Sequence, residues 1–149
     1  MQLVCPAGSL PALKAAVQEG ADAIYVGFRN DTNARHFAGL NLDDKQLDAG
    51  LQLIRQRGRK LYVAVNTYAH AGGWERWQRA VDRAADLGVD ALIAADPGVL
   101  AYASQRHPGL ALHLSVQGSA TSAAALSFYQ QRYSIRRAVL ARVLSLAQV

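Results

Sequence analysis

Short hydrophobic runs recur along the chain, and they begin about 20 to 38 residues apart, which is the length of a βα unit. Each run is hydrophobic at nearly every position, as is typical of parallel strands that are covered on both faces. The expected strands are residues 3–7, 23–26, 61–65, 91–95, 111–116 and 138–140.

Amphipathic segments separate these runs. Between the second and third runs, Leu47, Leu51 and Ile54 recur at helical spacing, and Gly58 follows as a helix stop. The segments 10–19, 74–87 and 98–106 also end at a glycine or proline, and the segment 122–132 follows a possible cap, Thr121. The expected helices are residues 10–19, 44–57, 74–87, 98–106 and 122–132.

Strands that alternate with helices predict an α/β fold with a mostly parallel sheet. A doubly wound sheet fits into about 150 residues, whereas a complete (β/α)8 barrel needs about 250. Residues 144–149 look like the start of a helix after the sixth strand, without a cap or breaker. This feature favours an incomplete (β/α)8 TIM-type barrel with about six parallel strands and five helices, in which residues 1–149 are the N-terminal part of a longer domain.

Composition excludes several classes of protein. The 149 residues are 51% hydrophobic and 18% charged, which suits one globular domain and opposes disorder. We expect no membrane span, because no run of 18 apolar residues occurs, and a cytoplasmic location, because there is no signal segment and only one cysteine, Cys5. A net charge of +5 permits nucleic-acid or anion binding. We favour the simpler interpretation that arginines at helix ends interact with the helix dipoles.

Six polar residues are candidate ligand contacts. Four follow successive expected strands, where sites of parallel α/β folds gather, although strand ends are also polar wherever they meet water. Two more lie in the long segment 28–42, where an arginine can bind a carboxylate or phosphate and a histidine can move protons near neutral pH, unless the segment is merely a solvated loop. The set is Arg35, His36, Asn66, Asp96, Gln117 and Arg142.

Common catalytic motifs are absent. The sequence has no GxGxxG, Walker, HExxH, CxxC or GxSxG pattern, so it predicts no metal site and identifies no catalytic residue. Cys5 and His113 are expected to be packing residues rather than a nucleophile and a ligand. The residues alone therefore predict an α/β protein that binds a polar or anionic ligand.

The opening stretch LVCPAGSLPALKAAVQEGADAIYVG resembles the collagenase-like U32 peptidase family, whose members begin with a PAG turn and a GADAxYxG strand. Further stretches, DTNARHFAGLN, SVQGSAT and VLARVLSLAQV, are similar to the UbiU-like branch of that family. The resemblance covers essentially all 149 residues. The first of these stretches is specific to the branch, whereas PAG and GADA mark only the wider family.

The resemblance implies a role in the oxygen-independent hydroxylation of ubiquinone precursors, together with a UbiV-like protein partner. In that branch each partner holds a [4Fe–4S] cluster through four cysteines, which lie beyond the segment that resembles this chain. Because this chain has only Cys5, we expect no cofactor in it, a cluster in a full-length parent, and no activity of these residues alone.

Alternatives remain open. The wider family has Arg-Glu after the sixth strand, but this chain has Arg142-Val143, which opposes a peptidase that uses that carboxylate. A U32-type peptidase, an RNA-base hydroxylation factor and a non-catalytic binding module are the other hypotheses. Open edges at the first and sixth strands lead us to expect self-association as well.

Overall fold

Six strands and five α-helices alternate along the chain. The computed structural model describes all residues, 1–149. In chain order the elements are β1 (Val4–Pro6), α1 (Leu10–Gln18), β2 (Ala23–Gly27), α2 (Asp44–Gln56), β3 (Lys60–Val65), α3 (Trp74–Asp86), β4 (Ala91–Ala94), α4 (Pro97–Arg106), β5 (Leu112–Leu114), α5 (Ala123–Tyr133) and β6 (Arg137–Ala138).

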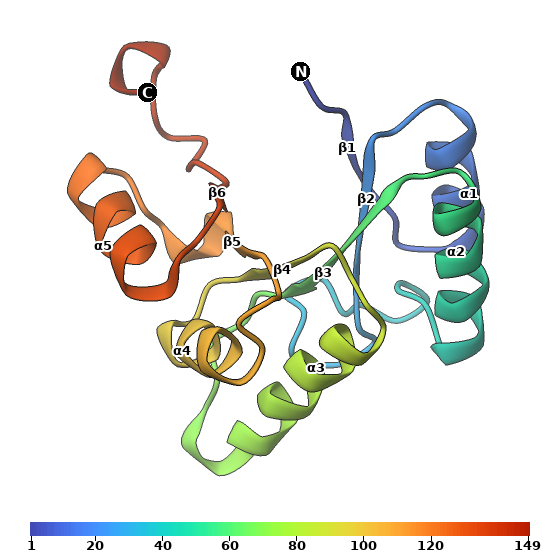
Figure 1. Cartoon of the computed structure of the whole chain (residues 1–149), viewed down its shortest axis with the longest axis horizontal. Helices are drawn as coiled ribbons and strands as arrows, with labels where there is room; N and C mark the ends of the chain where they lie inside the picture. The colour runs from blue at the N-terminus through green and yellow to red at the C-terminus, as the bar shows by residue number, and fades with distance from the viewer.

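All strands pair in parallel, and their spatial order is the same as their order in the chain. A doubly wound sheet would reverse this order at a switch point. Here the sheet curls, the helices lie on its outer side, and both termini lie on its open side (Figure 1). The prediction of an incomplete TIM-type barrel with six strands and five helices is therefore confirmed.

Two regions near the C-terminus differ from the predicted elements. Strand β6 has only two residues and begins at Arg137. The predicted final helix is a single 3₁₀ turn, Leu146–Gln148. Leu146 is 96% exposed, so this turn buries no apolar face, and a short helix without such packing is unstable in water.

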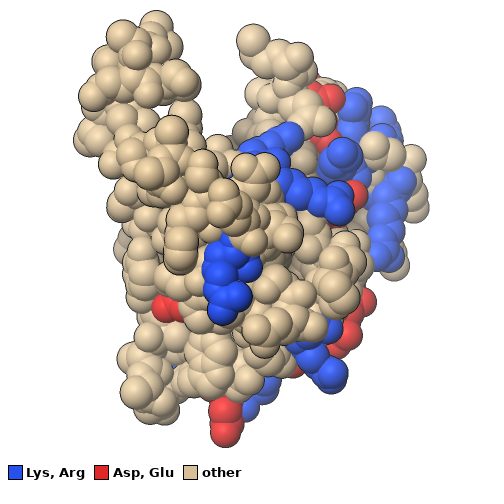
Figure 2. Space-filling model, turned by 60° about the vertical axis from the view of Figure 1, so that its left-hand side comes forward, with Lys and Arg blue, Asp and Glu red and all other residues tan.

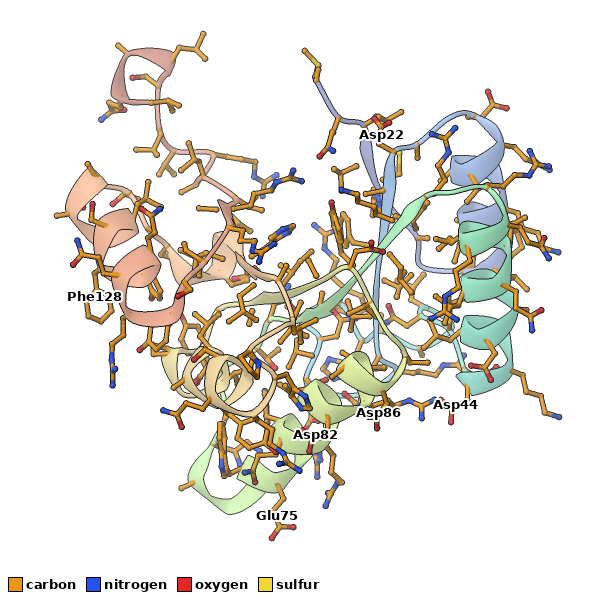
Figure 3. The ribbon with its side chains drawn as sticks, viewed as in Figure 1. Asp22, Asp44, Glu75, Asp82, Asp86 and Phe128 are labelled. Atoms are coloured by element: carbon orange, nitrogen blue, oxygen red, sulfur yellow. The ribbon has the colours of Figure 1, made fainter.

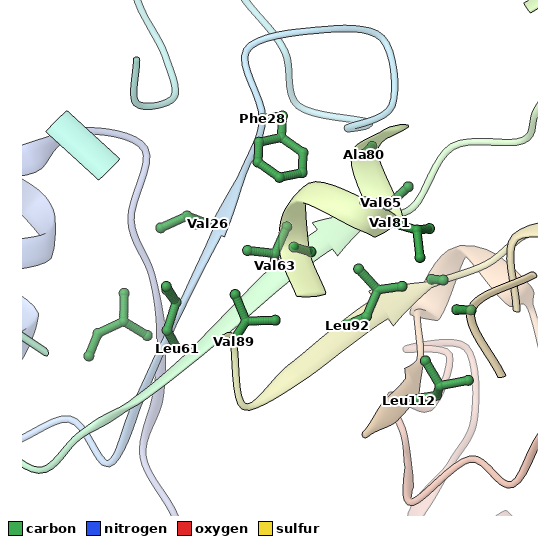
Figure 4. Packing of buried hydrophobic residues seen from close by; sticks show 14 of the residues in the cluster. Val26, Phe28, Leu61, Val63, Val65, Ala80, Val81, Val89, Leu92 and Leu112 are labelled. Carbon is green, nitrogen blue, oxygen red and sulfur yellow. The ribbon is translucent and has the colours of Figure 1, made fainter. Parts of the chain in front are cut away.

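Alternating strand residues build two layers. Residues such as Val63, Leu92 and Leu112 face the helices and form the large core with the buried sides of α3 and its neighbours (Figure 4). The strand residues at the alternate positions, including Ala23 and Tyr62, face the concave side of the sheet. The helices hold the first layer in place, while the second layer forms the surface on which a ligand site can develop.

Helix α3 illustrates how the helices attach to the sheet. Its buried residues Trp77, Ala80, Val81 and Ala84 follow helical spacing, and Trp77 is fully buried. The Trp77 Nε1–H donates to Thr67 Oγ1 at 3.2 Å, so its polar atom is satisfied as well. No helix in the structure combines the length and the apolar character that crossing a membrane requires.

We predict that Trp77→Ala lowers the free energy of unfolding by about 3–5 kcal/mol, because it leaves a large cavity between α3 and the sheet. Urea denaturation followed by circular dichroism measures the change. Phe37→Ala is the matched control, since Phe37 is 64% exposed, and it is expected to change stability by no more than about 0.5 kcal/mol. Equal losses in the two variants would contradict this packing.

Candidate functional site

A cavity of about 460 Å³ opens on the concave face of the sheet and reaches the carboxyl ends of the strands. Its floor is apolar and aromatic, with Tyr25, Tyr62 and Ile93 from successive strands. Its polar lining consists of Asn33, Arg35, Asn41, Asn66, His113, Ser115, Gln117 and Arg137. In parallel α/β folds, ligands bind at this end of the sheet.

The loop between β2 and α2 forms one wall, and hydrogen bonds of two asparagine side chains hold it in shape. Asn33 Nδ2 donates to Asn41 Oδ1 at 3.1 Å, and Asn41 Nδ2 donates to the Arg35 carbonyl at 2.9 Å. The Arg35 amide returns a bond to Asn33 Oδ1 at 3.2 Å. Both asparagines are buried, so these bonds are shielded from competing water and fix the backbone on either side of Arg35.

The absence of a side chain at Gly27 makes room for this network. A Cβ at that position would lie 2.0 Å from Asn33 Nδ2, well inside van der Waals contact. Gly27 is the last residue of β2, so the asparagine lies directly against the strand backbone. Close approach, rather than an unusual backbone angle, therefore requires glycine here.

Three of the six residues that were predicted to contact a ligand line the cavity: Arg35, Asn66 and Gln117. Asn66 Oδ1 accepts the Ala34 amide at 2.9 Å, which orients the side chain and leaves its Nδ2 group for a ligand. The Gln117 carbonyl accepts the Tyr68 hydroxyl at 2.9 Å, which fixes the turn after β5. The structure thus brings together residues from three separate βα loops.

The other three, His36, Asp96 and Arg142, lie outside the cavity lining. His36 Nδ1 is 2.8 Å from the Asn33 carbonyl, which can only accept, so Nδ1 carries the proton. Asp96 caps α4 through the amides of Gly98 and Val99 and also accepts the Ala69 amide. Arg142 lies in the exposed segment after β6.

His113, Tyr62 and Arg137 line the cavity although the sequence interpretation did not select them. His113 was expected to be a packing residue; it is indeed buried, but it faces the concave side, because Leu112 and Leu114 face the helices. The alternation of strand residues between the two faces of the sheet could have placed His113 on the concave side, but a three-residue strand such as β5 shows it only weakly.

The imidazole of His113 is neutral at physiological pH. Burial, together with the positive charges of Arg137 and Lys60, lowers its pKa from the usual 6.5 to about 4. Its ring contacts Tyr62 edge to face, with centroids 4.9 Å apart. A neutral imidazole can both donate and accept a hydrogen bond, so His113 offers a polar group without adding charge.

Arg35 and Arg137 are the only charged residues in the cavity lining, which includes no Asp or Glu. The acidic side chains labelled in Figure 3, such as Asp82 and Asp86 on α3, lie outside the concave face. On the face drawn in Figure 2, Lys and Arg form several separate groups rather than one continuous patch. The cavity itself therefore favours an anionic ligand.

No group of three or more His, Cys, Asp or Glu side chains lies close enough together to hold a metal ion. Cys5 is the only cysteine and is half-buried. These residues do not fit the four thiolate ligands of a [4Fe–4S] cluster.

The curled sheet and its cavity define a partial (β/α) barrel that is hollowed on its concave face. The family model for peptidase family U32 matches residues 8–149, and the chain belongs to this family. It is similar to "tRNA hydroxylation protein P" of Escherichia coli K12, with 32% identity over 99% of this chain and 32% of that protein. It is also similar to "Collagenase" of Porphyromonas gingivalis W83, with 32% identity over 99% of this chain and 34% of that protein.

A solved structure, that of the U32 peptidase Mk0906, has the same fold. It matches with a TM-score of 0.72 and 16% identity, over 89% of this chain and 56% of that one. The chain spans about a third of the length of the curated relatives it matches. The two relatives are named for different activities, RNA hydroxylation and collagen hydrolysis.

We predict that Gly27→Ala destabilises the fold by about 1–3 kcal/mol, because the added methyl group must displace the buried Asn33 amide. Gly109→Ala is the control, since no atom lies within 4 Å of a Cβ built there. Urea titrations of both variants test this prediction. A Gly27→Ala variant as stable as the control would show that the loop is not held against β2.

We predict that His113 makes the fold less stable in acid. Its folded pKa of about 4 lies below the unfolded value of 6.5, so its contribution is complete above pH 6.5 and is lost as the pH falls through 4. In His113→Gln, the free energy of unfolding should therefore fall less steeply between pH 6.5 and 4 than in the unchanged chain. Denaturant titrations across this range measure both slopes, and identical slopes would contradict the lowered pKa.

Proposed function

We propose that this chain forms the substrate-binding part of a UbiU-like protein that acts in the oxygen-independent hydroxylation of ubiquinone precursors. The observation that carries the proposal is the position of the stretch DTNARHFAGLN, residues 31–41. This stretch is the one most specific to the UbiU-like branch, and it supplies the cavity wall that contains Asn33, Arg35 and Asn41.

The chemistry of the cavity suits such a substrate. Tyr25, Tyr62 and Ile93 offer a flat apolar surface to a ring, and Arg35 offers a cation at the rim. The Asn66 amide lies beside this rim and is held by the Ala34 backbone. In this role Arg35, Asn66 and Gln117 contact and orient the substrate, while the hydroxylation chemistry depends on groups outside these residues.

In this proposal the cluster ligands come from parts of a longer parent protein, since Cys5 alone cannot supply them. The unpaired outer edges of β1 and β6 are where further strands or a UbiV-like partner would pair. The same edges would lead isolated copies of this chain to associate with one another. Light scattering that detects only a 16.0 kDa species would contradict this last point.

A second candidate is RNA-base hydroxylation, and similarity to the tRNA hydroxylation protein P of Escherichia coli favours it. A nucleotide also has a ring and an anionic group, so the same cavity chemistry supports it. Peptide hydrolysis is less well supported, although one relative is named a collagenase. The cavity lining offers no carboxylate for acid or base catalysis, and Val143 stands where the wider family has a glutamate.

The test is to delete the gene that encodes this chain and to grow the source organism without oxygen. We expect ubiquinone to be lost under these conditions and retained in cells grown with oxygen, as measured by liquid chromatography and mass spectrometry. Returning the gene with Arg35→Ala should restore clearly less ubiquinone than returning it unchanged. Arg79→Ala, an exposed position on α3 outside the cavity, is the control and should restore the full amount.

Hydroxylated nucleosides in tRNA and rRNA from the same cells are measured in parallel. Normal ubiquinone together with loss of a hydroxylated nucleoside would overturn the ubiquinone proposal in favour of RNA. Normal levels of both ubiquinone and hydroxylated nucleosides would overturn both the ubiquinone proposal and the RNA alternative.

A further inference from the structure

We propose that Tyr62, His113 and Arg137 form a subsite for the anionic substituent, a carboxylate or phosphate, of a planar aromatic ligand. The subsite lies on the concave face, on strands β3, β5 and β6. It rests on the proposed substrate cavity but specifies which end of the ligand these residues recognise. None of the three belongs to the loop wall around Arg35.

The three side chains are neighbours on one face of the sheet. His113 and Arg137 are register partners on adjacent parallel strands, so their side chains point to the same side. The rings of Tyr62 and His113 meet edge to face at a centroid separation of 4.9 Å and an interplanar angle of 77°. All three residues line the cavity.

The polar atoms of this group are available to a ligand. Arg137 Nη2 donates to Gln2 Oε1 at 2.7 Å in an exposed hydrogen bond, which uses one of the five guanidinium N–H groups and leaves the others unpaired within the chain. The ring nitrogens of His113 make no hydrogen bond within the chain, although the residue is only 7% exposed. An arginine cation and an unpartnered imidazole therefore line the same cavity.

This combination selects an anion on a flat ring. A guanidinium binds carboxylate and phosphate oxygens through parallel N–H bonds. The neutral imidazole adds one donor for an oxygen atom of the same group, and the Tyr62 ring provides an apolar face for the rest of the ligand. A cationic ligand would be repelled by Arg137 and by Lys60, which also acts on His113 from β3.

Anion binding and protonation of His113 are coupled. The charged groups that face His113 are Arg137 on β6 and Lys60 on β3, and no carboxylate lines the cavity to oppose them. A bound anion offsets these positive charges and therefore raises the pKa of His113. By reciprocity, the anion binds more tightly when His113 is protonated.

The experiment uses the 149-residue chain with ¹³C-labelled histidine and follows the His113 ring resonance by NMR, assigned with His113→Gln. The probe is benzoate, with phenyl phosphate as a second anion and benzamide as the neutral ring of the same shape. We expect a saturable shift of the His113 signal with benzoate or phenyl phosphate, a rise in its titration midpoint, and weaker binding of benzamide by about tenfold or more. The better anion shows whether the subsite prefers carboxylate or phosphate.

Arg137→Gln should weaken binding of the better anion by about tenfold or more and raise the midpoint of free His113, because one positive charge is removed. Arg132→Gln, on the exposed last turn of α5, is the matched control and should leave both unchanged. Equal binding of benzoate and benzamide, no response at His113 to either anion, or equal effects of the two arginine variants would overturn the subsite. Since the readout is anion binding, this result is independent of whether the cells lose ubiquinone.

Discussion

Parallel pairing of each strand with only its neighbours in the chain is the constraint on which the rest of the molecule depends. Parallel neighbours need a crossover, and right-handed crossovers taken in one direction place every helix on the same side of the sheet. The other side is then free of helices, and the carboxyl ends of all strands meet along one rim. The loop wall around Arg35, the Asn66 amide and the turn at Gln117 therefore come together although they lie far apart in the sequence.

The elements were predictable because their signals are local. Continuous apolar runs define buried strands, and stops such as Gly58 define helix ends. The faces of the strands were harder to predict, because a strand buried on both sides shows little alternation. His113 therefore looked like any packing residue. Arg137 lay outside the predicted sixth strand, residues 138–140, because the observed strand β6 begins one residue earlier.

Polar residues at strand ends are difficult to divide into cavity-lining residues and helix caps from the sequence, as Asn66 and Asp96 illustrate. Both follow a buried strand, but one lines the cavity while the other caps a helix and accepts three backbone amides. The sequence contains one clue, since Asp96 precedes Pro97, and an acidic residue before proline is typical of a helix start. Nothing comparable in the sequence separates Arg35 from His36, because only the asparagine network decides which of the two side chains lines the cavity.

The strand order also bears on how the chain assembles. Each strand from β2 to β6 adds to the edge formed by the strand before it, and within residues 1–149 every strand pairs only with its neighbours in the chain. Such nearest-neighbour coupling resembles that of repeat proteins, in which units are stabilised by the unit before them. The sheet can therefore grow from β1 towards β6 in the order in which the ribosome releases the chain, with each βα unit docking as it emerges.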